Sequence, residues 1–265
     1  MDLQLKGKTA FISGSTSGIG LAVAKILLQE GANVVINGRK QPELDKATEQ
    51  LQNLVGASQF ARGIAADLGN PEDTARLIEA LPKCDILINN VGIYKSTSFY
   101  ETSDADWQSM LNVNLMSGVR LSKALLPQML DRNWGRILFI SSECATLVPE
   151  DLIAYSTTKA ALLALSRGLA QLTSGTGVTV NAATPGSTLT EGAEAFLENL
   201  AKEKNQSIQQ VEAAFFKETR TSSLLERFAD VLEIAHTLTY YCSPLSAATN
   251  GAVIRLDGGS MGGLY

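Results

Sequence analysis

The sequence predicts an α/β fold: a single doubly wound domain with a seven-stranded parallel sheet and helices on both faces. Short apolar segments alternate with longer segments of helical periodicity along all 265 residues. Apolar segments without polar alternation are typical of strands buried on both faces, and helical connections make neighbouring strands parallel. No Pro- or Ser-rich linker interrupts this pattern, so we expect one domain over residues 1–265.

Seven segments rich in Val, Ile, Leu, Phe or Ala are expected to form the strands, in chain order. They are 9–13, 33–37, 59–65, 85–89, 135–141, 177–183 and 252–256. Six segments between or after them carry apolar residues at three- and four-residue spacing, which predicts helices. They are 19–29, 42–55, 71–81, 104–130, 152–173 and 229–241.

Residues 187–225 depart from the alternation, because about forty helix-forming residues separate the sixth strand from the last helix. Two interpretations stay open: a surface helix pair that closes the core, or a mobile lid over a substrate. The aromatic residues Phe196, Phe215 and Phe216 lie in this segment and favour an apolar substrate.

Composition excludes several classes of function. The 22 Lys and Arg residues against 27 Asp and Glu give a net charge of −5, so no positive field gathers nucleic acid. Three separated cysteines and a single histidine supply neither a disulfide framework nor a typical metal site, and we expect no metal. Without an evident signal peptide or membrane-spanning segment, we expect a soluble, cytoplasmic protein.

A glycine-rich turn follows the first strand and leads directly into the first helix. Glycine allows close backbone approach, and a helix N-terminus offers free N–H groups to a pyrophosphate. The spacing G-x-x-x-G-x-G in the first βα unit therefore predicts a dinucleotide site of the Rossmann type. The residues expected to contact the dinucleotide here are Gly14, Ser15, Ser17, Gly18, Ile19 and Gly20.

The end of the second strand indicates which dinucleotide binds. A carboxylate there accepts from the ribose of NAD, whereas an arginine pairs with the 2′-phosphate of NADP. This chain has Arg39 and Lys40 at that place and no carboxylate, which favours NADP(H). An exposed, unpartnered Arg39 is the alternative, and NAD(H) stays open.

Tyr155 and Lys159 open a predicted helix with a spacing of four, which puts phenol and ammonium on one face. A nearby ammonium favours the phenolate, so the pair suits proton transfer. Ser142 ends the fifth strand, where ligands of doubly wound sheets sit, and its hydroxyl can donate to a developing alkoxide. Asn114 lies among apolar helical residues; it either bonds backbone there or marks a kink that holds a relay water.

Together these features resemble the short-chain dehydrogenase/reductase family over nearly the whole chain. The motifs that carry the resemblance are the turn 13–20, Asp67 with Leu68, the run Asn89, Asn90, Val91 and Gly92, then Asn114, Ser142, Tyr155 with Lys159, and Pro185 with Gly186. Two departures are mild: Ser13 stands where the family usually has Thr, and Val91 where it usually has Ala.

The resemblance implies a role for each matching residue. Tyr155 would be the general acid/base, Ser142 would steady the substrate oxygen, and Asn114 would anchor a relay water. Lys159 would lower the Tyr155 pKa and hold the nicotinamide ribose. The remaining implied cofactor contacts are Asp67 and Leu68 at adenine, Asn90 and Gly92 on the adenosine side, and Pro185, Gly186, Thr188 and Thr190 near the nicotinamide.

We therefore predict an NADP(H)-dependent oxidoreductase that interconverts a carbonyl and an alcohol on a small molecule. 3-Oxoacyl-carrier-protein reduction is the enzymatic alternative, although residues 169–175 lack the basic side chains expected to dock an acidic carrier. A non-catalytic dinucleotide sensor is the other alternative, but sensors typically lose the Tyr, Lys or Ser. Nucleotide-sugar epimerase or dehydratase chemistry fits the turn spacing poorly.

Two further expectations concern specificity and assembly. Glu143, Cys144, Val148 and the segment 187–225 are expected to line the substrate pocket. By resemblance the chain forms a homo-oligomer, a tetramer or a dimer, and residues 160–165 are apolar nearly all round the helix.

Overall fold

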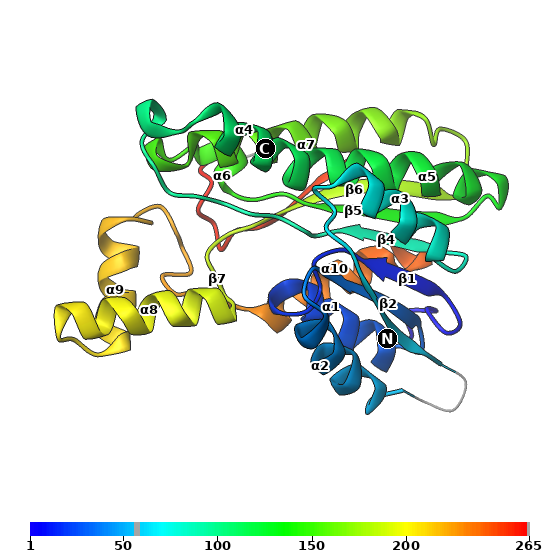
Figure 1. The fold of residues 1–265 in the computed structure, drawn as a ribbon, viewed down its shortest axis with the longest axis horizontal. Helices are drawn as coiled ribbons and strands as arrows, with labels where there is room; N and C mark the ends of the chain where they lie inside the picture. Colours follow the sequence, from blue (N-terminus) through cyan, green and yellow to red (C-terminus); the bar gives the residue numbers. More distant parts are fainter. Residues whose placement is uncertain (56–58, 264–265) are drawn as a thin grey trace.

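The computed structural model describes residues 1–55 and 59–263, and within them the predicted seven-stranded parallel sheet is present (Figure 1). Its strand order is β3-β2-β1-β4-β5-β6-β9, and every neighbouring pair is parallel. The strands are β1 (Thr9–Ile12), β2 (Asn33–Gly38), β3 (Ala61–Ala65), β4 (Ile86–Asn89), β5 (Gly135–Ile140), β6 (Val178–Pro185) and β9 (Val253–Leu256). The order reverses between β1 and β4, the place where doubly wound sheets bind ligands.

Both faces of the sheet are covered by helices, because both faces of its central strands are apolar. In β1, Ala10 and Ile12 join one hydrophobic core and Phe11 joins the other, and all three are 0% exposed. Helices α1, α2 and α10 pack on the first face, and α3, α5 and α7 on the second (Figure 1). The predicted two-faced burial is therefore confirmed.

The helices lie close to the predicted segments, and the short ones connect them. The α-helices are α1 (Gly18–Gln29), α2 (Gln41–Gln52), α3 (Pro71–Ala80), α4 (Asp104–Met110), α5 (Ser117–Asp131), α6 (Cys144–Leu147), α7 (Ile153–Gln171), α8 (Glu191–Lys204), α9 (Ile208–Glu218) and α10 (Val231–Cys242). Short 3₁₀ turns cover Phe99–Glu101, Glu150–Leu152 and Pro244–Ser246.

Some boundaries differ from the prediction. The helix expected over 42–55 ends at Gln52 and the strand expected over 59–65 begins at Ala61, while 56–58, and 264–265 of the predicted domain, lie outside the described residues. The last helix starts only at Val231, because Asp230 caps it through the N–H of Leu232.

The predicted helix 104–130 is divided by a π-helical turn at Leu111–Met116. The apolar spacing runs on through this turn, so periodicity alone does not reveal it. Asn114 lies within the turn, and π-helical turns inside longer helices often mark functional positions.

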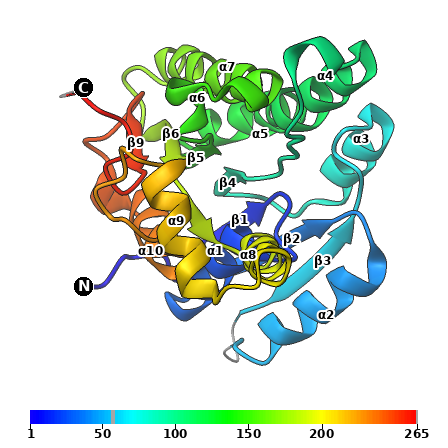
Figure 2. The ribbon, with the colours of Figure 1, turned by 90° about the vertical axis from the view of Figure 1, so that its left-hand side faces the viewer.

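Segment 187–225 contains a helical hairpin, α8 and α9, that stands beside the end of the sheet (Figure 2). Residues of 189–228 alone form its hydrophobic core, which includes Leu197, Val211 and Phe216. A two-stranded sheet of β7 (Thr188–Leu189) and β8 (Ala229–Asp230) joins the two ends of the segment. The helix pair is thus present, and the lid interpretation stays a prediction.

Candidate active site

The glycine turn after β1 has the conformation that only glycine adopts without strain. Gly14 and Gly18 have φ of 58° and 56°, in the left-handed region. A Cβ on Gly14 would lie 2.8 Å from Cα of Val91, and one on Gly20 would lie 2.6 Å from Nδ2 of Asn90. The bulk of Val91 at this place is therefore matched by the absence of a side chain at Gly14.

The N-terminus of α1 fits an anion such as a cofactor phosphate. Ser17 makes no side-chain cap and the first turn has no acidic residue, so the N–H groups are not used within the helix. The N–H of Gly18 donates instead to Oε2 of Glu191, 2.8 Å away at the start of α8. The N–H of Gly18 thus binds an anionic oxygen, as the predicted use of the turn requires, and the phosphate contact itself stays a prediction.

The side chains of Ser13 and Asn90 hydrogen-bond the glycine turn to the segment that follows β4. The Ser13 hydroxyl accepts from the N–H groups of Asn90 and Val91 at 2.9 and 3.0 Å. The Asn90 amide donates to the carbonyls of Ser13 and Gly14 at 3.0 and 2.7 Å. The Ser13 hydroxyl, a group that Thr would also provide, therefore makes structural hydrogen bonds. The Asn90 side chain hydrogen-bonds the main chain of the glycine turn.

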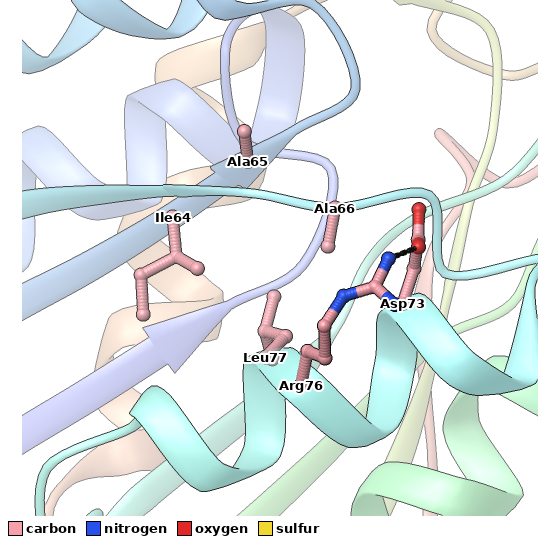
Figure 3. A pocket seen from close by; sticks show the side chains of 6 residues that line it. All are labelled: Ile64, Ala65, Ala66, Asp73, Arg76 and Leu77. Carbon is pink, nitrogen blue, oxygen red and sulfur yellow. Dashed lines mark hydrogen bonds and ion pairs between the residues drawn. The ribbon is translucent and has the colours of Figure 1, made fainter.

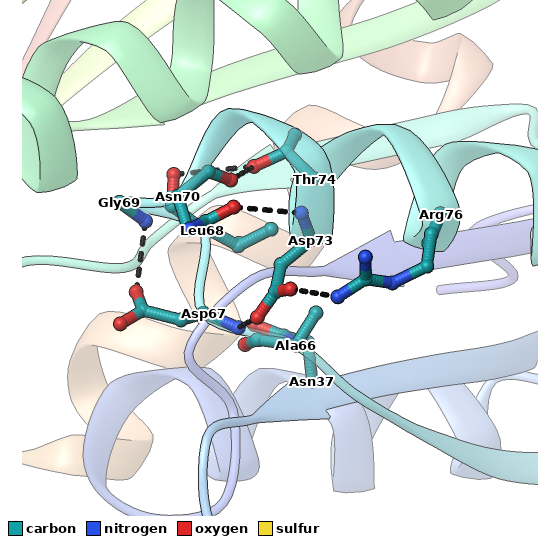
Figure 4. Close-up of polar contacts among 9 residues, drawn as sticks. All are labelled: Asn37, Ala66, Asp67, Leu68, Gly69, Asn70, Asp73, Thr74 and Arg76. Atoms are coloured by element: carbon teal, nitrogen blue, oxygen red, sulfur yellow. Dashed lines mark hydrogen bonds and ion pairs between the residues drawn. The ribbon is translucent and has the colours of Figure 1, made fainter.

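The ends of β2 and β3 and the start of α3 form the side of the site predicted for adenosine. Asn37 accepts from the N–H of Gly14 at 3.3 Å and donates to the carbonyls of Ile64 and Ala66 at 3.1 and 3.2 Å. Asp67 accepts from the N–H of Gly69 at 2.9 Å (Figure 4). Turn and strand ends are therefore held together by one buried amide.

A cavity of about 180 Å³ lies on this side, between β3 and α3 (Figure 3). It is lined by Ile64, Ala65, Ala66, Asp73, Arg76 and Leu77, and Asp73 and Arg76 form an ion pair at its rim. Leu68, a predicted adenine contact, is only 2% exposed. Arg39 is exposed just beyond β2 and forms no ion pair with any residue in 1–55 or 59–263.

At the other side of the switch point, the structure brings Ser142, Tyr155 and Lys159 together. Lys159 Nζ lies 5.6 Å from the centre of the Tyr155 ring, and Ser141, the residue before Ser142, donates to the carbonyl of Lys159 at 2.7 Å. Nζ donates to the carbonyl of Ile140 at 2.9 Å. The ammonium is thus fixed between the end of β5 and the tyrosine.

Burial acts on these two titrating groups in opposite directions. It raises the pKa of the Tyr155 phenol, and the neighbouring Ser142 hydroxyl partly offsets this effect. Burial lowers the pKa of Lys159 to about 8, so most of this side chain is charged at neutral pH. The site therefore holds a protonated phenol beside an ammonium that titrates in a physiological range.

Asn114 lies close to this group and is satisfied by protein atoms. Its Oδ1 accepts from the N–H of Ile93 at 2.8 Å, and its Nδ2 donates to the Ile93 carbonyl and to Thr158 Oγ1, both at 2.9 Å. The amide thus bonds backbone, as one interpretation expected, and lies in a π-helical turn, while the relay water of the other interpretation stays a prediction. Gly92 is the neighbour of both groups, since a Cβ there would lie 3.2 Å from Lys159 Nζ and 3.6 Å from Asn114 Oδ1.

Comparison with known proteins agrees with this geometry. The profile of the short chain dehydrogenase family matches residues 8–201, which include the glycine turn, Asn114, Ser142, Tyr155 and Lys159. The chain belongs to this family.

Two sequence relatives and one solved structure illustrate its similarity to other short chain dehydrogenases. The chain is 44% identical to the uncharacterized oxidoreductase YvaG of Bacillus subtilis, over 98% of each chain. It is 30% identical to the 3-oxoacyl-[acyl-carrier-protein] reductase FabG of Aquifex aeolicus, over 98% of this chain and 99% of the relative. L-Sorbose reductase from Gluconobacter frateurii, solved with NADPH and L-sorbose, superimposes over 100% of both chains with a TM-score of 0.93 and 30% identity.

These findings make the chain an NAD(P)-dependent oxidoreductase. No helix in the described part of the chain is long and apolar enough to cross a membrane.

The predicted nicotinamide contacts of this short chain dehydrogenase follow β6. Gly186 lies against Glu143, since a Cβ there would be 2.8 Å from Oε2. Thr188 donates to the carbonyl of Gly186 at 3.0 Å. Thr190 caps α8 by accepting from the N–H of Ala193, and its methyl carbon would be 3.3 Å from a Cβ on Gly18. Thr190 therefore lies at the glycine turn.

Three residues at the site were missed from the sequence. Tyr94 meets the Tyr155 ring edge-on at 5.9 Å between centroids, and Arg220 and Glu191 come from segment 187–225. The acidic position directly after Thr190 could have pointed to Glu191, since the first turn of a helix favours acidic residues. No local signal indicates Tyr94 or Arg220.

The three phenylalanines of segment 187–225 do not all face a substrate. Phe215 and Phe216 pack on each other and on Phe228, with ring centres 5.1–5.2 Å apart, and Phe196 is 48% exposed. Phe215 and Phe216 therefore contribute to the core of the hairpin, and the expectation of an apolar substrate stays a prediction.

Proposed function

We propose that this short chain dehydrogenase reduces the carbonyl group of a small molecule to an alcohol with NADP(H). The observation that carries the proposal is the place of Lys159 Nζ, which lies 5.6 Å from the centre of the Tyr155 ring and donates to the carbonyl of Ile140 at the end of β5, two residues before Ser142. This end of β5 lies at the same edge of the sheet as the glycine turn. When bound, the reduced nicotinamide supplies hydride to the carbonyl carbon. The predicted dinucleotide contacts would hold the cofactor between the glycine turn and the group formed by Ser142, Tyr155 and Lys159.

In this proposal Tyr155 donates its phenolic proton to the carbonyl oxygen as that oxygen becomes an alkoxide. The raised pKa that burial gives the phenol keeps it protonated before the reaction. Ser142 donates a hydrogen bond to the same oxygen, and the ammonium of Lys159 stabilises the phenolate left behind. Asn114 fixes the distorted helix behind Lys159, and a relay water there stays part of the proposal.

NADP(H) is proposed over NAD(H) because Arg39 and Lys40 follow β2 and no carboxylate stands there. Arg39 is exposed and without an ion-pair partner in the described residues, which leaves it free to meet a 2′-phosphate. The NADPH in the L-sorbose reductase structure supports this choice.

The test is a screen of small ketones and aldehydes with NADPH and with NADH, read as kcat/KM. We expect turnover with at least one class of ketone, a preference for NADPH, and loss of that preference in Arg39→Ala. Binding of NADPH without turnover of any substrate would point to a non-catalytic sensor, and a preference for NADH would remove the role of Arg39.

3-Oxoacyl-carrier-protein reduction remains the second candidate, supported by the relative from Aquifex aeolicus. Against it, the end of α7 and the turn after it contain no basic side chain over residues 169–175. A carrier-bound 3-oxoacyl chain in the same screen decides between the two. We also propose that the chain forms a homo-oligomer, a dimer or a tetramer, which sedimentation would test.

A further inference from the structure

Glu143 is a buried carboxylate directly after Ser142, and only one of its two oxygens accepts a hydrogen bond within the described residues. It is 3% exposed, and its Oε1 accepts from Nε of Arg220 at 3.2 Å. Its Oε2 has no hydrogen-bond partner within the described residues; nearby Ser260 gives its proton to the carbonyl of Asp257. A buried oxygen of this kind is costly unless a ligand satisfies it.

Arg220 is the matching donor from the hairpin. It follows α9, its side chain is only 16% exposed, and its ring neighbour is Phe215 at 5.7 Å. A guanidinium has five N–H donors. Within residues 1–55 and 59–263 two of them make hydrogen bonds, one from Nε to Glu143 and a long one of 3.4 Å from Nη1 to the Thr219 carbonyl. Arg220 therefore has N–H groups without an acceptor in the described residues, next to a Glu143 oxygen without a donor.

The pair lies beside the proposed reaction centre. Glu143 directly follows Ser142 in the chain, and its N–H donates to the carbonyl of Pro185 at 2.9 Å. Oε2 also lies against Gly186, one of the predicted nicotinamide contacts. Since Phe215 and Phe216 pack within the hairpin core, the hairpin contributes a charged group here.

We propose that Glu143 and Arg220 bind a hydroxyl group adjacent to the substrate carbonyl, so that the enzyme acts on neutral hydroxyketones. A hydroxyl can donate to Oε2 and accept from the guanidinium, and it thereby satisfies both partners. A carboxylate substituent would meet the charge of Glu143, and an ammonium would meet that of Arg220. The inference rests on the proposed reductase function and specifies its substrate class.

A substrate that lacks the hydroxyl leaves these buried groups unpaired. Sites built to bind a hydroxyl discriminate strongly against analogues without it. We therefore expect kcat/KM with NADPH to be at least about 100-fold higher for 1-hydroxy-2-butanone than for 2-butanone, which has the same carbon chain.

Variants can distinguish recognition of the substrate hydroxyl by Glu143 and Arg220 from a purely structural ion pair between the hairpin and the end of β5. The double variant Glu143→Gln/Arg220→Met keeps the shapes but leaves no single buried charge unpaired, and its folding is checked by thermal melting. We expect its preference to fall below about tenfold, mainly through a higher KM for the hydroxyketone. The matched control is Arg227→Met, which breaks the exposed pair of Arg227 with Glu233 and keeps the preference.

Each outcome decides the inference. Equal use of both ketones by the native enzyme, or an equal loss for both in a folded double variant, would overturn the role of the pair while leaving the reductase function intact. A failure to reduce any ketone with either cofactor would instead reject the proposed function itself.

Discussion

The glycine turn and the helical hairpin meet at the same site but are held in different ways. The turn is fixed by main-chain bonds and neutral side chains at neighbouring strand ends, such as the buried Asn37 and the half-buried Asn90. The hairpin has its own apolar core and meets the site through charged side chains, Glu191 at Gly18 and Arg220 at Glu143. The cofactor side therefore depends on the packing of the sheet, whereas the hairpin has a core of its own and a few polar contacts with the site.

The first prediction breaks the hairpin alone. Phe216→Ala removes a ring that is 6% exposed from the hairpin core, at a cost of about 3 kcal/mol. We expect proteolytic cleavage within residues 191–218 to accelerate about 100-fold, with the sheet remaining folded. The control Phe196→Ala, at a ring 48% exposed, changes little. If Phe216→Ala only lowers the Tm of the whole protein, the hairpin is not a separate unit.

The second prediction breaks the cofactor side. Gly20→Ala places a Cβ 2.9 Å from the carbonyl oxygen of Gly14 and from Cα of Ser15, neither of which can yield cheaply. We expect the Kd for NADPH, from fluorescence titration, to rise about 10- to 100-fold. Gly168→Ala in α7 is the control, because nothing lies within 4 Å and alanine favours a helix. Unchanged binding in Gly20→Ala would contradict the assignment of the turn.

The third prediction uses the pKa of Lys159, which burial lowers to about 8. The ammonium is charged below that pH and neutral above it, so kcat/KM for ketone reduction should be level at lower pH and fall above about pH 8. Lys159→Arg keeps a charge at all these pH values and should abolish the fall, although its rate is lower. A fall that persists in this variant would assign the titration to another group.

The smallest effect is expected where hairpin and turn touch. Glu191→Gln removes a negative charge from the place proposed for a cofactor phosphate, so NADPH should bind about threefold more tightly at low ionic strength. Glu194→Gln, in the same first turn of α8, is the matched control and should change the Kd less. Weaker binding in Glu191→Gln would mean that the carboxylate assists the cofactor.

The contrast also explains what could be predicted from the sequence. The sheet followed from local patterns, because strands such as β1 are apolar on both faces, and Ser142, Tyr155 and Lys159 followed from their places at strand and helix ends. Asn114 among apolar residues indicated a possible kink, but apolar periodicity does not reveal the π-helical turn, which accompanies hydrogen bonds of Asn114 with Ile93 and Thr158, 21 and 44 residues away.

The contacts of the hairpin with the site could not be predicted either, because they also join residues far apart in the sequence. Gly18 and Glu191 are 173 residues apart, and Glu143 and Arg220 are 77 apart, so no pattern within one segment pairs them. Apolar periodicity likewise did not reveal that Phe215 and Phe216 pack against each other and against Phe228.

Proton transfer by Tyr155 is the central claim, and Tyr155→Phe tests it most directly. With a ketone that the native enzyme reduces, kcat should fall by at least ~100-fold, the lower end of what a general acid contributes, while the Kd for NADPH stays within about threefold. Near-native turnover by a folded, NADPH-binding Tyr155→Phe protein would contradict the account.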